Sequence, residues 1–222
     1  MINVNDVYEQ VATLSRKAEN GYHSGEDFNA QARLVQAYLF DWYFARSEKN
    51  QRIVDSLRPF IKEPVLPINS GEVALPSDYR HRIEVAVGYV QNNTDTEFYP
   101  APYIDGKEEV RSSRSYVRRP SITRKRFYHT IKASTIKILP TDFNGVVRLK
   151  YLAYPADVNW ASQIDTDNDV ENYTSTGSIH FEWEPMDEQN IVSLFLFLKG
   201  IQTRQSELIQ WVAEQRQIVK SD

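Results

Sequence analysis

The hydrophobic periodicity of the sequence changes twice along the chain, and this change limits the possible folds more than any other feature. Near both ends, apolar residues recur at helical spacing, whereas in the middle they alternate as in β-strands. Helices that flank a run of strands are typical of an α+β protein. We therefore predict a helical bundle formed by the N- and C-terminal helices, with a central antiparallel β region, sandwich or barrel-like, inserted between them.

The N-terminal region, residues 1–62, predicts two helices. Asn20-Gly21 is a typical helix end, and Ser24 with Asp27 forms a capping box that starts the second helix. This second helix is predicted to continue to Pro59. It is rich in aromatic residues and apolar around most of its girth, so it must be covered by other elements or by other subunits.

The middle region, residues 63–180, predicts strands. Ile83, Val85 and Val87 alternate with other side chains as in a half-buried strand. Asn144-Gly145 favours a hairpin between two strand-like runs, with a shared buried face. That face comprises Ile136, Ile138, Val147, Leu149 and Tyr151. The polar residues 156–176 are predicted to form a loop.

The last region, residues 181–222, predicts two more helices. The first begins with Pro185 in its first turn, carries Asp187 where the helix dipole favours it, and ends at Gly200. A last helix is predicted over residues 204–219. Because we find no internal repeat and no low-complexity linker, we predict a single domain over residues 1–222, with the sub-regions 1–62, 63–180 and 181–222.

Several classes of function lack their sequence signatures. The chain has no cysteine, which excludes disulfides, thiolate catalysis and Cys-based metal sites. It contains no phosphate-binding glycine loop and no GxSxG motif, and its four histidines show no metal-binding spacing. These are His23, His81, His129 and His180, which we expect to be ordinary surface or packing residues. We expect no catalytic residue, no cofactor and no metal.

A calcium loop and a membrane span are also not expected. Residues 165–171 imitate the opening of an EF-hand loop, but Val170 and Thr176 stand where that motif needs Gly and Glu. The longest apolar run, Ile191–Leu198, is far shorter than the roughly 20 residues of a transmembrane helix, and no signal peptide is evident. We expect a soluble protein that is made in the cytoplasm and has no membrane partner.

One segment, Arg111–Lys132, concentrates positive charge and aromatic residues; we call it the basic segment. Its composition suits a surface that binds nucleic acid, but exposed strands are also commonly charged without binding anything. Residues 157–188 contain nine Asp and Glu and no Lys or Arg. The opposite charges of the basic segment and of residues 157–188 suit a head-to-tail contact, in which successive copies of the chain close a ring. The candidate contact residues are Arg111, Arg114, Arg118, Arg119, Arg124, Lys125, Arg126, Asp165, Asp167 and Asp169.

Three stretches of the sequence resemble one family when they are taken together. "VALPSDYRHRIEVAV" at residues 73–87 resembles the entry into the β region of podovirus head-to-tail adaptor and tail-tubular proteins. "IKILPTDFNGVVRLKYLAYPADVNW" at residues 136–160 is similar to their hairpin. Residues 178–215 are similar to the closing helices of the ring proteins of crAss-like phages. The N-terminal helices agree in type but carry no matching motif.

This resemblance implies a structural protein of the virion. Such proteins form a ring of about twelve copies at the portal-tail junction, and this ring extends the DNA channel. The implied partners are further copies of the chain, the portal protein and neighbouring tail ring or hub proteins, with channel DNA only incidental. The implied location is the tail of the virion, after synthesis in the bacterial host. Pro76, Asp78 and Tyr79 would form a structural turn, with Asp78 bonded to backbone amides. The alternative is a phage accessory protein that binds nucleic acid through the basic segment.

Overall fold

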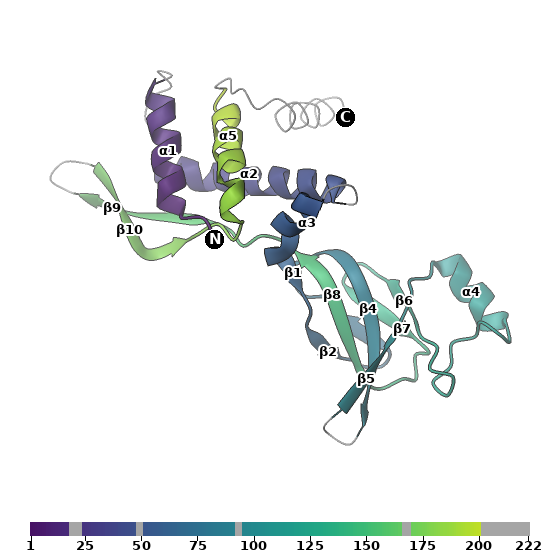
Figure 1. Cartoon of the computed structure of the whole chain (residues 1–222). Helices are drawn as coiled ribbons and strands as arrows, with labels where there is room; N and C mark the ends of the chain where they lie inside the picture. The colour runs from purple at the N-terminus through teal and green to yellow at the C-terminus, as the bar shows by residue number, and fades with distance from the viewer. Residues whose placement is uncertain (18–23, 48–50, 92–94, 166–169, 201–222) are drawn as a thin grey trace. The chain divides into compact units, whose positions relative to one another are not determined.

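The chain has an α+β fold, as predicted, and its contacts divide it into two compact units. The computed structural model describes residues 1–17, 24–47, 51–91, 95–165 and 170–200. Unit 1 comprises residues 1–60 and 155–222, and unit 2 comprises residues 61–154 (Figure 1). Unit 2 is therefore an insertion in unit 1; the sequence predicts a single domain with a β-rich insertion over residues 63–180.

Unit 1 contains helices and one β-hairpin. Its elements are α1 (Val4–Lys17), α2 (Gly25–Arg46), α3 (Gln51–Leu57), η1 (Arg58–Phe60), β9 (Asn159–Asp165), β10 (Val170–Ile179), η2 (Pro185–Asp187) and α5 (Glu188–Leu198). The Ser24 hydroxyl accepts a hydrogen bond from Asp27 N at 3.1 Å, so the predicted helix start is confirmed. The end at Gly200 is confirmed too, because Gly200 takes a left-handed φ of 79° directly after α5. The predicted continuous helix to Pro59 is wrong, since α2 ends at Arg46 and α3 is a separate helix. The predicted helix over residues 204–219 lies outside the described residues.

The core of unit 1 is aromatic. α5 packs against α1 and α2 (Figure 1). The rings of Phe28 and Phe195 stack with their centroids 4.7 Å apart. Trp183 is fully buried. Its ring centroid lies 4.6 Å from that of Phe60 and 5.6 Å from that of Tyr43. These contacts cover one face of the aromatic helix α2 with elements of its own chain.

The segment that was predicted as a loop, residues 156–176, instead contains most of the antiparallel β9–β10 hairpin. Trp160 explains why so polar a sequence forms strands here. Its ring is buried and stacks on Tyr8 at 4.0 Å, and its indole N–H donates to Asn5 at 3.0 Å. The backbone N–H of Trp160 donates to Asn29 at 2.7 Å. Because these contacts attach the hairpin to α1 and α2, the second boundary of the insertion lies at residue 155 and not near residue 180.

Unit 2 consists of antiparallel strands and one helix. Its elements are β1 (Ile61–Lys62), β2 (Val65–Pro67), β3 (Glu72–Ala74), β4 (Tyr79–Gln91), β5 (Asp95–Pro100), α4 (Gly106–Arg114), β6 (Tyr128–Ile131), β7 (Thr135–Leu139) and β8 (Val146–Ala153). One sheet has the order β1-β8-β4-β5, with β2 also paired to β8, and the second has the order β3-β7-β6. Both sheets contribute to one hydrophobic core. All five residues of the predicted buried face belong to it, namely Ile136, Ile138, Val147, Leu149 and Tyr151.

The predicted hairpin between β7 and β8 is wrong, although both strands exist. β7 pairs with β3 and β6, whereas β8 pairs with β4, β1 and β2. Phe143 in the connection between them is buried, and its ring lies 4.9 Å from that of Phe127 and 4.8 Å from that of Tyr89. This aromatic anchor enters the core shared by the two sheets, so the connection leads the chain from one sheet to the other.

The predicted alternation of buried residues in β4 is confirmed for two of the three predicted positions. Val85 and Val87 are buried, but the side chain of Ile83 is 44% exposed. The pairing of β4 with β8 shifts register between Arg82 and Glu84, and such a bulge turns the next side chain to the other face of the sheet. Ile83 therefore lies outside the core.

A buried polar cluster links the helices of unit 1. Asp187 is fully buried, and its carboxylate accepts hydrogen bonds from the Tyr43 hydroxyl and, at 3.3 Å, from the Ser56 hydroxyl. The Asn190 amide donates to the same Tyr43 oxygen at 2.9 Å. Burial, followed by the hydrogen bond to Asp187, raises the pKa of Tyr43 well above its usual range. Asp187 thus bonds to α2 and α3, while no side-chain bond from it caps α5.

Replacing Tyr43 with Phe is expected to destabilise the fold by about 1–3 kcal/mol, because it removes a donor from a buried carboxylate. Urea unfolding of the full chain measures this change. Tyr38→Phe, in the same helix, is the matched control and should change the free energy of unfolding by less than about 0.5 kcal/mol. Equal effects of the two variants would contradict a stabilising role for the cluster.

Candidate assembly surface

The basic segment lies entirely in unit 2, where it begins in α4 and ends just after β6. The Asp105 carboxylate caps α4 by accepting a hydrogen bond from Glu108 N at 2.7 Å. Arg111 and Arg114 occupy the last turn of α4, where the helix dipole favours positive charge. Residues 115–127 then form turns, and strand structure starts only at Tyr128. Within the basic segment, strand structure is thus limited to its last residues, in β6.

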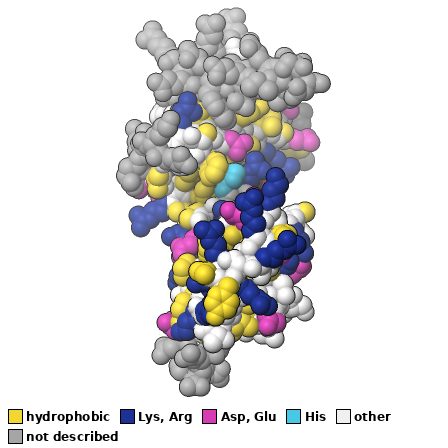
Figure 2. Space-filling model, turned by 90° about the vertical axis from the view of Figure 1, so that its right-hand side faces the viewer, with side chains coloured by type: hydrophobic (Ala, Val, Ile, Leu, Met, Phe, Trp, Pro, Cys, Tyr) yellow, Lys and Arg dark blue, Asp and Glu magenta, His cyan; other side chains and the backbone are white. Residues whose placement is uncertain are grey.

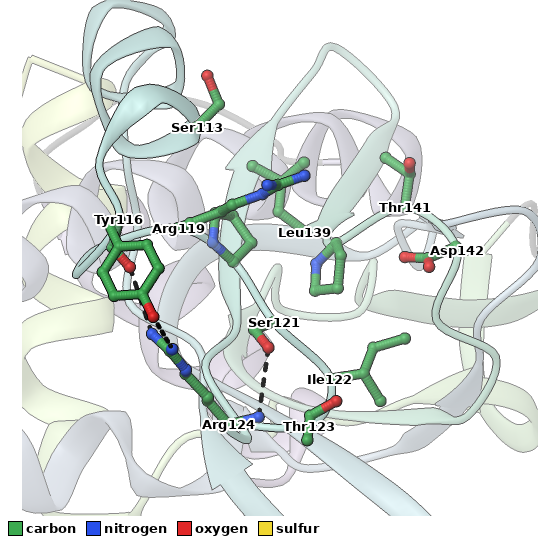
Figure 3. A pocket seen from close by; sticks show the side chains of 12 residues that line it. Ser113, Tyr116, Arg119, Ser121, Ile122, Thr123, Arg124, Leu139, Thr141 and Asp142 are labelled. Carbon is green, nitrogen blue, oxygen red and sulfur yellow. Dashed lines mark hydrogen bonds between the residues drawn. The ribbon is translucent and has the colours of Figure 1, made fainter.

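The turns after α4 enclose an open pocket of about 770 Å³ (Figure 3). Its apolar lining comes from Pro120 and Ile122 and from Leu139 and Pro140 at the end of β7. Arginines stand at its rim, and hydroxyl groups lie between them. The polar lining residues are Ser113, Tyr116, Arg119, Ser121, Thr123, Arg124, Thr141 and Asp142.

Arg124 is held in place at the rim of this pocket. Its guanidinium lies 5.0 Å from the centroid of the Tyr116 ring and donates to the carbonyl oxygen of Tyr116 at 3.3 Å and to its hydroxyl at 3.4 Å (Figure 3). The backbone N–H of Arg124 donates to the Ser121 hydroxyl at 3.3 Å. These neutral partners orient the guanidinium without neutralising its charge.

A second hollow of about 520 Å³ lies beside the same segment. Arg111 and Arg118 contribute to its lining together with Glu108 and Tyr128. Arginines among residues 111–119 therefore line both the first pocket and this second hollow. No ion pair or side-chain hydrogen bond of Arg111, Arg114, Arg118 or Arg119 occurs within the part of the chain that the structure describes.

The two lysines of the basic segment form ion pairs within unit 2, and Arg126 is partly buried there. The Lys125 ammonium pairs with Glu97 at 3.1 Å and bonds to the Tyr99 hydroxyl; the bonds to Tyr99 and Glu97 raise the pKa of Lys125. Lys132 pairs with Glu72. One guanidinium nitrogen of Arg126 is buried and has no hydrogen-bond partner among the described residues. Lys125 and Arg126 are thus poor candidates for a contact with another molecule, and Arg119 and Arg124 are the best.

Exposed apolar side chains lie among the free arginines. The side chain of Tyr116 is 82% exposed and that of Val117 is 67% exposed. Figure 2 views the molecule from the side of α4 and shows Lys and Arg side chains over unit 2, with hydrophobic ones between them. Tyrosine and arginine are enriched at the energetic centres of protein interfaces. The composition of this surface therefore suits a protein partner.

The predicted acidic candidates lie in unit 1. Asp165 is the last residue of β9, whereas Asp167 and Asp169 lie outside the described residues. Elsewhere in the acidic stretch, Glu171 accepts a hydrogen bond from Gly25 N at 2.9 Å and Glu182 accepts one from Ala156 N at 3.1 Å. These carboxylates have local structural roles, but their neutral donors leave the negative charge in place.

The division into units separates the charge of the chain. Unit 2 contains 15 Lys and Arg against 10 Asp and Glu, whereas unit 1 contains 11 Lys and Arg against 20 Asp and Glu. The formal charges are thus +5 for unit 2 and −9 for unit 1, which together give the −4 of the chain. The charge asymmetry that the sequence shows along the chain becomes an asymmetry between two compact bodies.

The predicted structural turn at Pro76, Asp78 and Tyr79 precedes and opens β4. The Asp78 carboxylate accepts hydrogen bonds from Lys62 at 2.6 Å and from the Tyr151 hydroxyl at 2.8 Å. Burial raises the pKa of Asp78, but the hydrogen bonds from Lys62 and Tyr151 outweigh burial and lower that pKa below its usual value. The pKa of Tyr151 is raised to about 12 by burial and by its hydrogen bond to Asp78. The Tyr79 backbone N–H donates to the Pro76 carbonyl at 3.1 Å. The Asp78 carboxylate thus joins β1 and β8, a long-range role that the prediction of local backbone bonds misses.

His129 is a buried packing residue beside the basic segment. Its Nε2 lies 2.8 Å from an Arg82 guanidinium nitrogen, and its Nδ1 lies 2.5 Å from the Ala101 carbonyl oxygen. A neutral imidazole satisfies both, because Nδ1–H donates to Ala101 and Nε2 accepts from Arg82. Burial lowers the pKa of His129 to about 4, with the Arg82 charge acting in the same direction and the bond to Ala101 opposing it.

The stability of unit 2 is expected to fall between pH 6.5 and pH 4 because of His129. In the unfolded chain the imidazole takes up a proton near pH 6.5, whereas in the folded chain it does so only near pH 4. The unfolded state therefore binds more protons in this window, and the loss approaches about 3 kcal/mol at its acid end. Urea unfolding at several pH values measures the slope. His129→Gln should flatten the slope between pH 6.5 and 5, and an unchanged slope would contradict this assignment.

Within the described ranges, no three His, Asp or Glu side chains lie close enough together to hold a metal ion. None of the described helices is long and apolar enough to cross a membrane. No protein-family model matches the sequence, and no curated protein matches it.

Proposed function

We propose that this chain is a non-enzymatic structural subunit of a ring at the portal-tail junction of a tailed phage. The virion assignment is supported by the resemblance of residues 73–87, 136–160 and 178–215 to head-to-tail adaptor and ring proteins. Assembly into a ring is supported by one structural observation, the separation of charge between the two units. In this proposal the basic unit 2 of one copy meets the acidic unit 1 of the next.

A head-to-tail contact of this kind places two different surfaces against each other. When the rotation between successive copies closes, such a contact forms a ring in which every copy has the same surroundings. Complementary charge steers the encounter and suppresses contacts between like units. The free arginines and the exposed Tyr116 supply specific contacts in addition to this general attraction.

Reversing the charge of three exposed arginines is expected to impair assembly. The variant Arg118→Glu/Arg119→Glu/Arg124→Glu replaces attraction by repulsion at the proposed contact, so ring formation should weaken by roughly tenfold or more. Sedimentation velocity of the purified protein, or its incorporation into particles, measures the change. The matched control replaces the same three residues with Lys, which keeps the charge and should still assemble. Normal rings of the Glu variant would show that the basic segment is not the interface.

The copy number per virion tests the location directly. Quantitative mass spectrometry of purified particles, with the portal protein as internal standard, is expected to give a ratio near one, because a tail ring matches the symmetry of the portal. A ratio far above one would assign the chain to the shell or to packaged cargo. Absence from particles would refute the virion assignment.

A second candidate function follows from the same surface. Tyr116 is exposed beside several arginines, and this combination also suits stacking on bases and contact with phosphates. A protein that binds nucleic acid should bind as an isolated monomer, and its affinity should fall by orders of magnitude from low to moderate salt. The ring subunit is expected to bind a single-stranded oligonucleotide weakly under both conditions. Tight binding that is lost in Tyr116→Ala would favour this alternative.

A further inference from the structure

We propose that the pocket beside the basic segment receives the turn around η2 of a second copy of the chain. This turn comprises residues 184–188, belongs to unit 1 and is called the η2 turn below. The inference rests on the proposed head-to-tail assembly and names the two surfaces that meet in it.

The chemistry of the pocket defines the kind of segment that fits it. Its volume of about 770 Å³ has an apolar part, and Arg119 and Arg124 stand at its rim (Figure 3). An apolar segment flanked by carboxylates suits both features, because it buries apolar surface and pairs the arginines. Asp142 is the one carboxylate of the lining, and Figure 3 shows it on the other side of the pocket from Tyr116 and Arg124. The carboxylates of the segment are therefore expected nearer to Arg124 than to Asp142.

The η2 turn has this combination of side chains. Pro185 is exposed, and Met186 is 45% exposed. Glu184 and Glu188 lie two positions before and two positions after Met186, and neither forms an ion pair within the part of the chain that the structure describes. Glu188 accepts a hydrogen bond from the amide of Gln10, a neutral donor that leaves its charge in place. The turn thus presents two apolar side chains between two charged carboxylates.

Two buried residues hold the η2 turn in position. Trp183 precedes it and is fully buried, and Asp187 within it is fully buried and bonded to Tyr43. The backbone N–H of Asp187 also donates to the Glu184 carbonyl at 2.9 Å. Because both flanks are fixed in the core of unit 1, Pro185 and Met186 are held at the surface. A segment that is already ordered loses little conformational freedom when it binds.

Other exposed apolar side chains of unit 1 have fewer carboxylates beside them. Met186 has three Asp or Glu residues within two positions in the sequence. Among the other described residues of unit 1, Val54 and Ile164 have one each. The remaining exposed side chains of this kind have none, namely Met1, Leu14, Leu34, Phe44 and Ile179. The η2 turn is therefore the segment of unit 1 that matches the pocket best.

A contact between copies uses every site in a closed assembly. Each copy carries one such pocket in unit 2 and one η2 turn in unit 1. When the η2 turn of each copy enters the pocket of the next, the contact is heterologous and repeats around a ring without leaving a free site. The pocket and the η2 turn thus provide the specific register that overall charge alone does not define.

Disulfide trapping between two differently tagged chains tests this contact, and the absence of natural cysteine makes the background low. One chain carries Gln189→Cys, at an exposed position directly after the η2 turn, and the other carries Thr123→Cys in the pocket lining. The matched control for the pocket chain is Lys107→Cys, an exposed position of α4 outside the pocket lining. Mild oxidation is expected to give a 1:1 disulfide-linked heterodimer in several-fold higher yield with Thr123→Cys than with this control.

An exchange of charges between the two chains tests the pairing itself. Adding Arg119→Glu/Arg124→Glu to the pocket chain should reduce the yield by roughly tenfold or more, since two attractive charges become repulsive. Adding Glu184→Lys/Glu188→Lys to the other chain should have the same effect. When both changes are combined, attraction returns and the yield should recover, which also shows that both variants fold.

The outcomes separate this contact from the proposed function. A heterodimer yield no greater than that of the Lys107→Cys control would overturn the contact, and so would a yield that does not recover after the exchange of charges. If rings form while no cross-link does, the contact fails and the ring proposal stands with another surface as its interface. If the cross-link forms but particles lack the protein, the contact stands and the virion assignment fails.

Discussion

Burial of Trp160 is the interaction on which the organisation of unit 1 depends. Its ring lies on Tyr8 of α1 and against Gly25, the first residue of α2, where a Cβ would come within 2.5 Å of ring carbons. Only glycine permits this approach, so the start of α2 and the hairpin determine each other's position. The same contacts make residues 155–179 part of unit 1, and unit 2 becomes an insertion between two halves of a helical body.

Local signals in the sequence predict the α+β class and several helix ends, whereas the pairing of the strands depends on non-local contacts. Ser24 and Gly200 act within one helical turn, so helix starts and ends can be predicted from a few residues. Strand partners depend on residues far away in the chain, and Phe143 leads β8 away from β7 by a contact with Phe127 and Tyr89. The β9–β10 hairpin is missed because Trp160 is the one fully buried residue among its described side chains, and a single residue gives no periodicity.

The candidate surface is predictable as a charged segment but not as a site. Lys125 and Lys132 look equivalent to Arg119 in the sequence, yet their partners Glu97 and Glu72 lie 28 and 60 residues away, and only the fold brings them together. Two of the apolar residues that line the pocket, Leu139 and Pro140, lie beyond the basic segment at the end of β7. Sequence patterns therefore identify which charges are present, whereas folding decides which of them remain available.

In the proposed ring, the separation of +5 and −9 between the units would limit how copies can meet. Like units repel, so symmetric contacts between two copies of unit 1 or of unit 2 are disfavoured relative to contacts between unlike units. At physiological ionic strength, however, charges separated by more than about 8 Å are largely screened. Net charge therefore selects the kind of contact and speeds encounter, but it cannot set the angle between neighbouring copies. In the proposed ring that angle would have to come from groups in direct contact, and the guanidinium of Arg124, which Tyr116 holds in one orientation, is suited to such a contact.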